Sequence, residues 1–269
     1  MARADGRRAA ASKVLDSFEA MIGRANVNDS GKARIGACLT LTIFEQFRSA
    51  LCLIDNNLGT HAAGPIRSML EGVTDLLNLS QRAEYLDQLH FENARNNVIL
   101  FDELMKLDGV PADMAEKVGK WREVEQPIRN RLAKAGHTKI DVAQKMRNGG
   151  IGDAYAQYRI LCAFVHTSIT SLLSRHAGRE RLTELGYCRQ PDEPVIGMML
   201  LIAVDLLVRA ASELHHFSDL NEDEVNAVAE SAKAMWAAVD PDYVQSSAED
   251  AKEAKPAEPA QPAALAADR

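Results

Sequence analysis

Residues 195–208 read VIGMMLLIAVDLLV and form the most apolar stretch of the chain. Asp205 interrupts this stretch, which is also shorter than the ~20 apolar residues that span a bilayer. We therefore expect a buried core helix, continuing to about residue 217. Elsewhere apolar residues recur at spacings of three and four, with no alternating β-branched run between turns. The sequence predicts an all-α protein without a membrane-spanning segment.

The helical pattern predicts a single-domain up-and-down bundle of about seven to eight helices. Residues 1–8 are expected to be a flexible basic N-terminus, and residues 9–239 the helical domain. Residues 240–269 are rich in Ala, Pro and Glu and predict a disordered tail, because they bury too little apolar surface to fold. The major helices are expected at 9–24, 32–57, 65–80, 82–107, 111–134, 153–174, 195–217 and from about 219 to 239, with a short helix within 138–152.

Charge and cysteine usage restrict the functional classes. The net charge of −7 argues against broad electrostatic binding of DNA or anionic membranes. The sequence contains no transcription-factor motif, so sequence-specific DNA binding is not expected. The four cysteines, at positions 38, 52, 162 and 188, form no C-x-x-C pair, which indicates a reducing compartment. The N-terminal residues lack the apolar region of a signal peptide, so a cytoplasmic location is expected.

The first candidate site lies in the helix expected at 153–174. Helical spacing places Tyr155, Arg159, Cys162 and His166 on one face. Burying such a polar stripe on an apolar helix costs free energy unless its groups are hydrogen-bonded or bind a ligand. His suits proton transfer near neutral pH and Arg suits a phosphate, so the pair fits phosphodiester cleavage with a 2'-hydroxyl nucleophile. The alternative is a core histidine that pairs with a neighbouring helix.

A second candidate is the i,i+4 pair Arg67 and Glu71 on the helix expected at 65–80. Either it is a solvated salt bridge of small value, or it is buried and contacts the helix that carries His166. A third pattern, Glu213-x-x-His216, has the spacing of di-iron bundles, but its nearest counterpart is only Asp87-x-x-His90. We therefore expect neither a metal site nor a cofactor.

Two segments carry a family resemblance. Residues 67–72, RSMLEG, are followed about ninety residues later by Tyr158-Arg159 and by FVHTS at 164–168. This combination resembles the bacterial domain of unknown function 5677 over about residues 32–217. The resemblance implies an all-helical fold and specifies no activity.

Arg159 and His166 are also similar to the Arg-x(4 to 6)-His motif of HEPN domains. These helical proteins include metal-independent endoribonucleases of toxin and antiviral defence systems. The spacing here is Arg-x6-His, and Ile160 stands where HEPN nucleases usually carry Asn, Asp or His. The resemblance implies RNA as a candidate partner and a homodimer, because HEPN sites are composite across a dimer.

Two functional hypotheses remain open on the sequence. In the first, His166 and Arg159 are catalytic in an endoribonuclease. The residues expected to support the site or position the substrate are Tyr155, Tyr158, Arg67, Glu71 and Ser168. In the second, the chain is a non-catalytic helical binding or scaffold module, in which the Arg, His and Glu side chains form a structural network.

Overall fold

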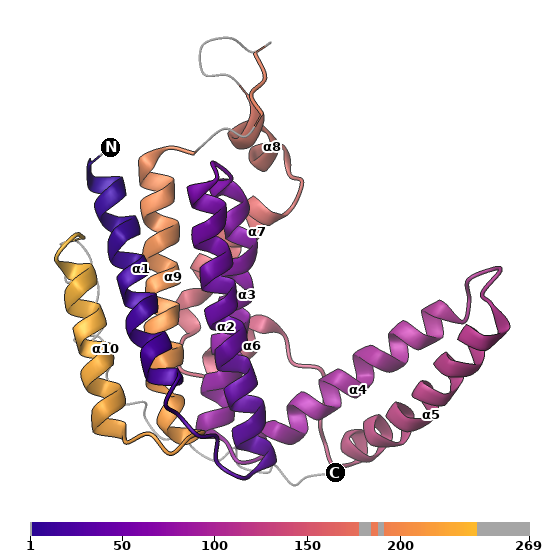
Figure 1. Ribbon diagram of the computed structural model, residues 1–269. Coiled ribbons are helices and arrows are strands. Elements are labelled where there is room, and N and C mark those ends of the chain that lie inside the picture. The colour runs from indigo at the N-terminus through magenta and orange to yellow at the C-terminus, as the bar shows by residue number, and fades with distance from the viewer. Residues whose placement is uncertain (1, 178–183, 188–190, 241–269) are drawn as a thin grey trace, which may run out of the picture.

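The computed structural model of the protein describes residues 2–177, 184–187 and 191–240. These residues form ten α-helices, three 3-10 helices and no β-strand, which confirms the all-α prediction (Figure 1). The α-helices are α1 (Ala2–Ile22), α2 (Gly31–Asp55), α3 (Ala63–Gln81), α4 (Tyr85–Leu104), α5 (Ala112–Lys134), α6 (Val142–Asn148), α7 (Tyr155–Val165), α8 (Ile169–His176), α9 (Glu193–Ser212) and α10 (Glu222–Ala237). The 3-10 helices are η1 (Gly59–Ala62), η2 (Gly152–Ala154) and η3 (Leu214–His216).

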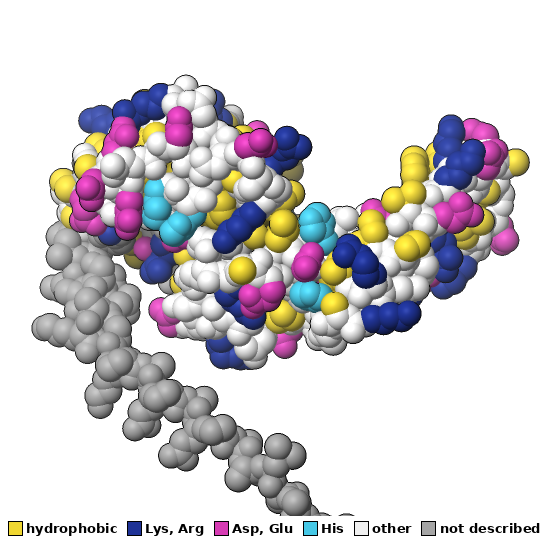
Figure 2. Space-filling view, turned by 90° about the horizontal axis from the view of Figure 1, so that it is seen from below, with side chains coloured by type: hydrophobic (Ala, Val, Ile, Leu, Met, Phe, Trp, Pro, Cys, Tyr) yellow, Lys and Arg dark blue, Asp and Glu magenta, His cyan; other side chains and the backbone are white. Residues whose placement is uncertain are grey.

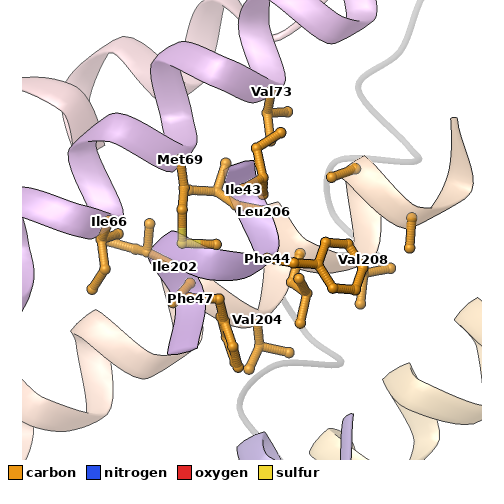
Figure 3. Packing of buried hydrophobic residues seen from close by; sticks show 14 of the residues in the cluster. Ile43, Phe44, Phe47, Ile66, Met69, Val73, Ile202, Val204, Leu206 and Val208 are labelled. Atoms are coloured by element: carbon orange, nitrogen blue, oxygen red, sulfur yellow. The ribbon is translucent and has the colours of Figure 1, made fainter. Parts of the chain in front are cut away.

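Helix α9 lies in the middle of the bundle, between α1, α10, α2 and α3 (Figure 1). Its buried residues include Ile202, Val204 and Leu206, so the core helix predicted from the apolar stretch is confirmed. Figure 3 shows these side chains packed with Phe47 of α2 and Met69 of α3. Burying each such side chain stabilises the fold by roughly 1.5–3 kcal/mol, which makes this cluster the main source of the bundle's stability.

Two helices are long and apolar enough to cross a membrane by length and composition, namely α2 and the segment Glu193–His216 that joins α9 to η3. Most of α9 is buried inside the bundle, and α2 buries one side against α3 and α9. This packing is compatible with a protein outside the membrane. Cys38 and Cys52 are exposed on α2 and Cys162 is half-buried, whereas Cys188 lies outside the described residues.

The first helix begins at Ala2, not near residue 9 as expected, so the segment expected to be flexible is helical from its second residue. Arg7 lies in this added part and donates from Nη2 to Asp240 at 3.0 Å, and its Nη1 lies 3.7 Å from Glu193. Ala10 and Ala11 of α1 are buried. The sequence could not show these contacts because Asp240 is 233 residues away. The disordered tail was predicted at 240–269, but its first residue, Asp240, is buried and holds Arg7, and residues 241–269 lie outside the described residues.

The prediction of a single helix at 153–174 is wrong, because the chain forms two helices, α7 and α8, with a break at His166. His166 has extended backbone angles, with φ −76° and ψ 150°. Ser168 caps α8 by accepting a hydrogen bond from the backbone N–H of Ser171, and the Ser171 hydroxyl donates to the carbonyl of His166 at 2.5 Å. Short hydroxyl side chains compete with helical hydrogen bonds, and no Gly or Pro signals the break. This division helps to raise the number of described α-helices to ten, above the expected seven to eight, whereas α6 is the short helix expected within 138–152.

Helices α4 and α5 form a hairpin that projects from the bundle (Figure 1). Its base is held by Lys145 of α6, whose Nζ donates to Asp75 of α3 at 3.0 Å and to Glu92 of α4 at 2.6 Å. Tyr85, at the start of α4, donates to the same Asp75 at 2.6 Å. All four side chains are largely buried, so this cluster fixes the angle at which the hairpin leaves the bundle.

Candidate functional site

Helices α3 and α7 pack side by side and bring together three of the predicted residues. Arg67 donates from Nη2 to Glu71 at 2.7 Å and to the hydroxyl of Tyr158 at 3.0 Å. Its guanidinium carbon lies 5.2 Å from the centroid of the Tyr158 ring, within cation–π range. Arg67 and Glu71 are thus a half-buried pair that contacts α7, so the pair is neither fully solvated nor fully buried. We call these residues the Arg67–Glu71–Tyr158 network.

The protonation states of this network follow from its geometry. Burial lowers the pKa of Arg67, but the hydrogen bond to Tyr158 and the charge of Glu71 more than offset this and raise it. Burial raises the pKa of Tyr158, and the nearby Glu71 carboxylate acts in the same direction, although Arg67 opposes both. The arrangement is therefore a guanidinium held between a carboxylate and a neutral phenol. It joins α3 to α7 as a fixed polar contact.

Two more of the predicted residues lie on α7, where Tyr155 is partly buried against the core and Arg159 is exposed. The rings of Tyr155 and Tyr158 stack with centroids 6.0 Å apart and planes 20° from parallel. Arg159 is exposed, and its pKa is raised first by a hydrogen bond to the Tyr155 side chain. No carboxylate among the described residues pairs with Arg159.

The structure does not place His166 on the same helical face as Arg159, because α7 ends at Val165. His166 lies in the connection between α7 and α8, and its side chain is exposed. No hydrogen bond or ion pair joins its ring to another described residue. Ser168 has a structural role as the N-cap of α8, with its hydroxyl 3.2 Å from the backbone nitrogen of Ser171.

The segment from Tyr155 to His176 contains no Asp or Glu, in a chain whose net charge is −7. It carries Arg159, His166, Arg175 and His176, and we call it the basic segment. A run of this length without Asp or Glu can be seen in the sequence, so the basic segment could have been identified without a structure.

Sequence reasoning missed that His61 of η1 joins the basic segment. His61, Arg175 and His176 line one small pocket, together with Asn57, Leu58, Thr60 and Tyr187. The pKa of His61 is lowered, first by burial and then by the charges of Arg175 and His176. The guanidinium of Arg175 donates to the carbonyl oxygen of Phe164. The histidines lie far apart in sequence and follow no pattern, so only the fold brings them together.

The Glu213-x-x-His216 pattern lies where α9 ends and η3 begins. His216 Nε2 lies 3.7 Å from Glu213, and the His215 and His216 rings are 3.9 Å apart between centroids. Burial lowers the pKa of His216, and His215 lowers it further. Within the described part of the chain, no three His, Cys, Asp or Glu side chains could hold a metal ion together.

Comparison with known proteins gives one match. A family model described as a family of unknown function, DUF5677, matches residues 33–182. This range covers more than half of the chain and runs from α2 through α8, so it contains the Arg67–Glu71–Tyr158 network and the basic segment. No curated protein and no solved structure matches the chain.

Proposed function

The chain belongs to the family of unknown function DUF5677, and we propose that it acts on RNA as a HEPN-like, metal-independent endoribonuclease. In this proposal Arg159 and His166 of the basic segment carry the reaction. The Arg67–Glu71–Tyr158 network supports them by fixing α7 against α3.

The observation that carries the proposal is the exposure of Arg159 and His166 within a segment that has no acidic residue. A polar group kept for structure is normally paired and at least partly buried, as the Arg67–Glu71–Tyr158 network is. Arg159 and His166 are instead open to solvent and have no carboxylate partner among the described residues. A local surface of this charge attracts phosphates even when the whole chain is acidic.

The proposed chemistry is transesterification at the RNA backbone. His166 accepts the proton of a 2'-hydroxyl while that oxygen attacks the adjacent phosphorus. The bond from phosphorus to the 5'-oxygen breaks, the leaving oxygen takes a proton from water, and His166 gives its proton to the hydroxide so formed. The products are a 2',3'-cyclic phosphate and a 5'-hydroxyl. Arg159 stabilises the negative charge that develops on the phosphoryl oxygens, and Tyr155 positions the backbone beside it.

The Arg67–Glu71–Tyr158 network favours a second candidate function, a non-catalytic helical binding or scaffold module. Its three side chains contact one another across α3 and α7, through Nη2 of Arg67 at 2.7 Å from Glu71 and 3.0 Å from Tyr158, which is the kind of contact that holds two helices together. If Arg159 and His166 serve only to bind, the same surface would hold RNA without cleaving it.

The test is cleavage of end-labelled RNA in the presence of EDTA by wild type, His166→Ala and Arg159→Ala. Matched controls are His90→Ala on α4 and Arg34→Ala on α2, which remove an exposed His and an exposed Arg elsewhere. We expect cleavage by wild type and both controls, and a loss of roughly 100-fold or more for His166→Ala, the usual scale for general acid–base groups. All variants should keep the wild-type circular dichroism spectrum.

Two results would overturn the endoribonuclease. One is RNA that stays intact with every variant, and then retention of RNA binding would favour the scaffold module. The other is cleavage that EDTA abolishes or that His166→Ala leaves unchanged, which would point to a contaminant or to another site.

A further inference from the structure

A small pocket between η1 and α8 is lined by three basic side chains. On the face of the molecule in Figure 2, Lys and Arg lie among Asp and Glu, as expected for a chain with 31 Lys and Arg and 38 Asp and Glu residues. The pocket is different, because His61, Arg175 and His176 line it and none of its described lining residues is Asp or Glu. We call it the His61 pocket, and its other lining residues are Asn57, Leu58, Thr60 and Tyr187.

The three basic side chains disfavour one another's positive charge. Burial lowers the pKa of His61 below its ordinary value, and the charges of Arg175 and His176 lower it further. No acidic group among the described residues offsets this effect. Like charges brought together without a counter-ion cost free energy, and a bound anion removes that cost because it favours the imidazolium. The charge of the His61 pocket therefore favours an anion as its occupant.

Backbone carbonyls hold two of the three side chains in place. Arg175 donates from Nη2 to the carbonyl oxygen of Phe164, which uses one of the five N–H donors of a guanidinium. Nδ1 of His176 lies 3.1 Å from the carbonyl oxygen of Gly186. Because a carbonyl only accepts, Nδ1 is the donor, and a proton on Nε2 makes that atom a second donor. Both side chains are thus oriented and keep N–H groups beyond those that the carbonyls use.

The position of Arg175 and His176 in the last turn of α8 explains only part of the pocket. Basic side chains there stabilise the carbonyl end of a helix and need no ligand. His61 is different, because η1 runs directly into α3 and leaves no carbonyl end for His61 to stabilise. No hydrogen bond or ion pair joins the His61 ring to another described residue. An anion in the pocket explains why a third basic side chain comes from a separate element.

The volume of the pocket matches a single phosphate group. It is about 40 Å³, which is room for roughly three water molecules at ~10–15 Å³ each. A nucleoside does not fit in this space. A phosphomonoester carries a charge of about −1.5 to −2 near neutral pH and three terminal oxygens, so it suits three basic side chains better than a singly charged phosphodiester. The pocket is therefore built for the end of a phosphorylated molecule.

We propose that the His61 pocket binds the terminal phosphate of an RNA strand. Arg175 connects the pocket to the candidate catalytic residues, because it contacts the carbonyl of Phe164 near the end of α7, two positions before His166. A strand whose end is fixed here lies beside the segment that carries Arg159 and His166. RNA as the source of the phosphate rests on the proposed endoribonuclease, whereas the binding of a phosphate group does not.

The first test is a titration of the full chain with inorganic phosphate, followed by NMR of the histidine ring protons. Sodium chloride at the same ionic strength is the control for general screening. We expect saturable shifts for His61 and His176, a rise in the pKa of His61, and no shift for the exposed His90 of α4. His61→Gln should weaken phosphate binding roughly 10-fold, the scale of one charge-assisted hydrogen bond, whereas the matched His90→Gln should not change it.

The second test compares three forms of one short RNA, with a 5'-phosphate, with a 3'-phosphate and with hydroxyls at both ends. They are bound to His166→Ala, so that the strands stay intact. We expect one phosphorylated form to bind roughly 10-fold more tightly than the unphosphorylated strand, and His61→Gln in the same background to abolish this preference. Equal binding of the three forms would overturn RNA as the source and assign the pocket to free phosphate or a small phosphomonoester.

Two results of the phosphate titration would overturn the pocket itself. One is a set of shifts that sodium chloride reproduces, and the other is a His61→Gln variant that binds inorganic phosphate as tightly as wild type. Neither result depends on RNA cleavage. A chain that leaves RNA intact while its His61 still responds to phosphate would instead overturn the endoribonuclease and retain the phosphate pocket.

Discussion

The hydroxyl of Tyr158 accepts a hydrogen bond from Nη2 of Arg67 at 3.0 Å, across 91 residues of sequence. Glu71 accepts a hydrogen bond from the same nitrogen at 2.7 Å, so one end of the guanidinium is held by two partners. The contact orients α7, and with it the exposed Arg159. Residues with a structural role and residues available to a ligand therefore lie on the same helix, only one position apart.

Tyr158→Phe should destabilise the protein without changing its fold. The variant removes the acceptor of Arg67 and leaves the ring in place, so we expect a loss of about 1 kcal/mol in the free energy of unfolding by urea. Tyr155→Phe is the control, because its hydroxyl contacts only the exposed Arg159 among the described residues, and its effect should stay within about 0.5 kcal/mol. Equal effects of the two variants would contradict the assignment.

Ser168 caps α8, and its substitution separates capping from substrate positioning. Ser168→Ala should weaken the hydrogen-exchange protection of residues 169–176 by about 1 kcal/mol, whereas Ser168→Gly, which caps nearly as well, should cost only a few tenths. If the hydroxyl only caps, Ser168→Gly keeps the RNA cleavage rate of wild type. Loss of cleavage with α8 still protected would instead place Ser168 at the substrate.

Lys145→Met should be among the most destabilising single substitutions at the base of the hairpin. Asp75 and Glu92 would face each other without their cation in a largely buried site, which costs about 3 kcal/mol. The control is Lys233→Met on α10, where the side chain is 43% exposed and the effect should stay within about 0.5 kcal/mol. Urea unfolding at neutral pH measures both, and similar midpoints would refute the anchoring role.

The same cluster predicts a loss of stability in alkali. Burial lowers the pKa of Lys145, but Asp75 and Glu92 raise it above its ordinary value. Burial and then Asp75 raise the pKa of Tyr85. Both groups keep protons that the unfolded chain releases near pH 10, so their contribution is complete below about pH 10 and is lost as pH rises further.

Urea midpoints from pH 8 to pH 11 measure this loss. Tyr85→Phe removes one of the two titrating groups, so the variant should show a shallower decline above pH 10 than wild type. Parallel curves for the two proteins would show that Tyr85 does not contribute.

Gly36 is required for the approach of α2 to Phe217. A Cβ at position 36 would overlap the Phe217 ring, which is fully buried, so Gly36→Ala should cost about 1–3 kcal/mol. Gly119 is also helical, but a Cβ at position 119 would meet no atom within 4 Å, so Gly119→Ala should stabilise α5 by about 1 kcal/mol. Thermal unfolding of both variants tests the contrast, and two shifts in the same direction would contradict it.

Helix positions and the core were predictable because they depend on local periodicity. The apolar run at 195–208 became the buried α9, and most other helices begin and end within a few residues of the expected positions. The short motifs at residues 67–72 and 158–168 were enough to identify the family. The pairing of Arg67 with Glu71 followed from their spacing, since residues four apart on a helix face the same side.

Only the tertiary structure decided which side chains from different helices lie together at the candidate site. The break at His166 arises from hydroxyl caps that compete with helical hydrogen bonds, and such local competition leaves no Gly or Pro in the sequence. The contacts of Arg7 with Asp240, of Arg67 with Tyr158 and of His61 with the basic segment join residues far apart in the chain. Periodicity shows which side of a helix is apolar, but which neighbour covers that side depends on the packing of the whole bundle. For the same reason the sequence predicted helices at α4 and α5, whereas the fold decided that they pair with each other and project from the bundle.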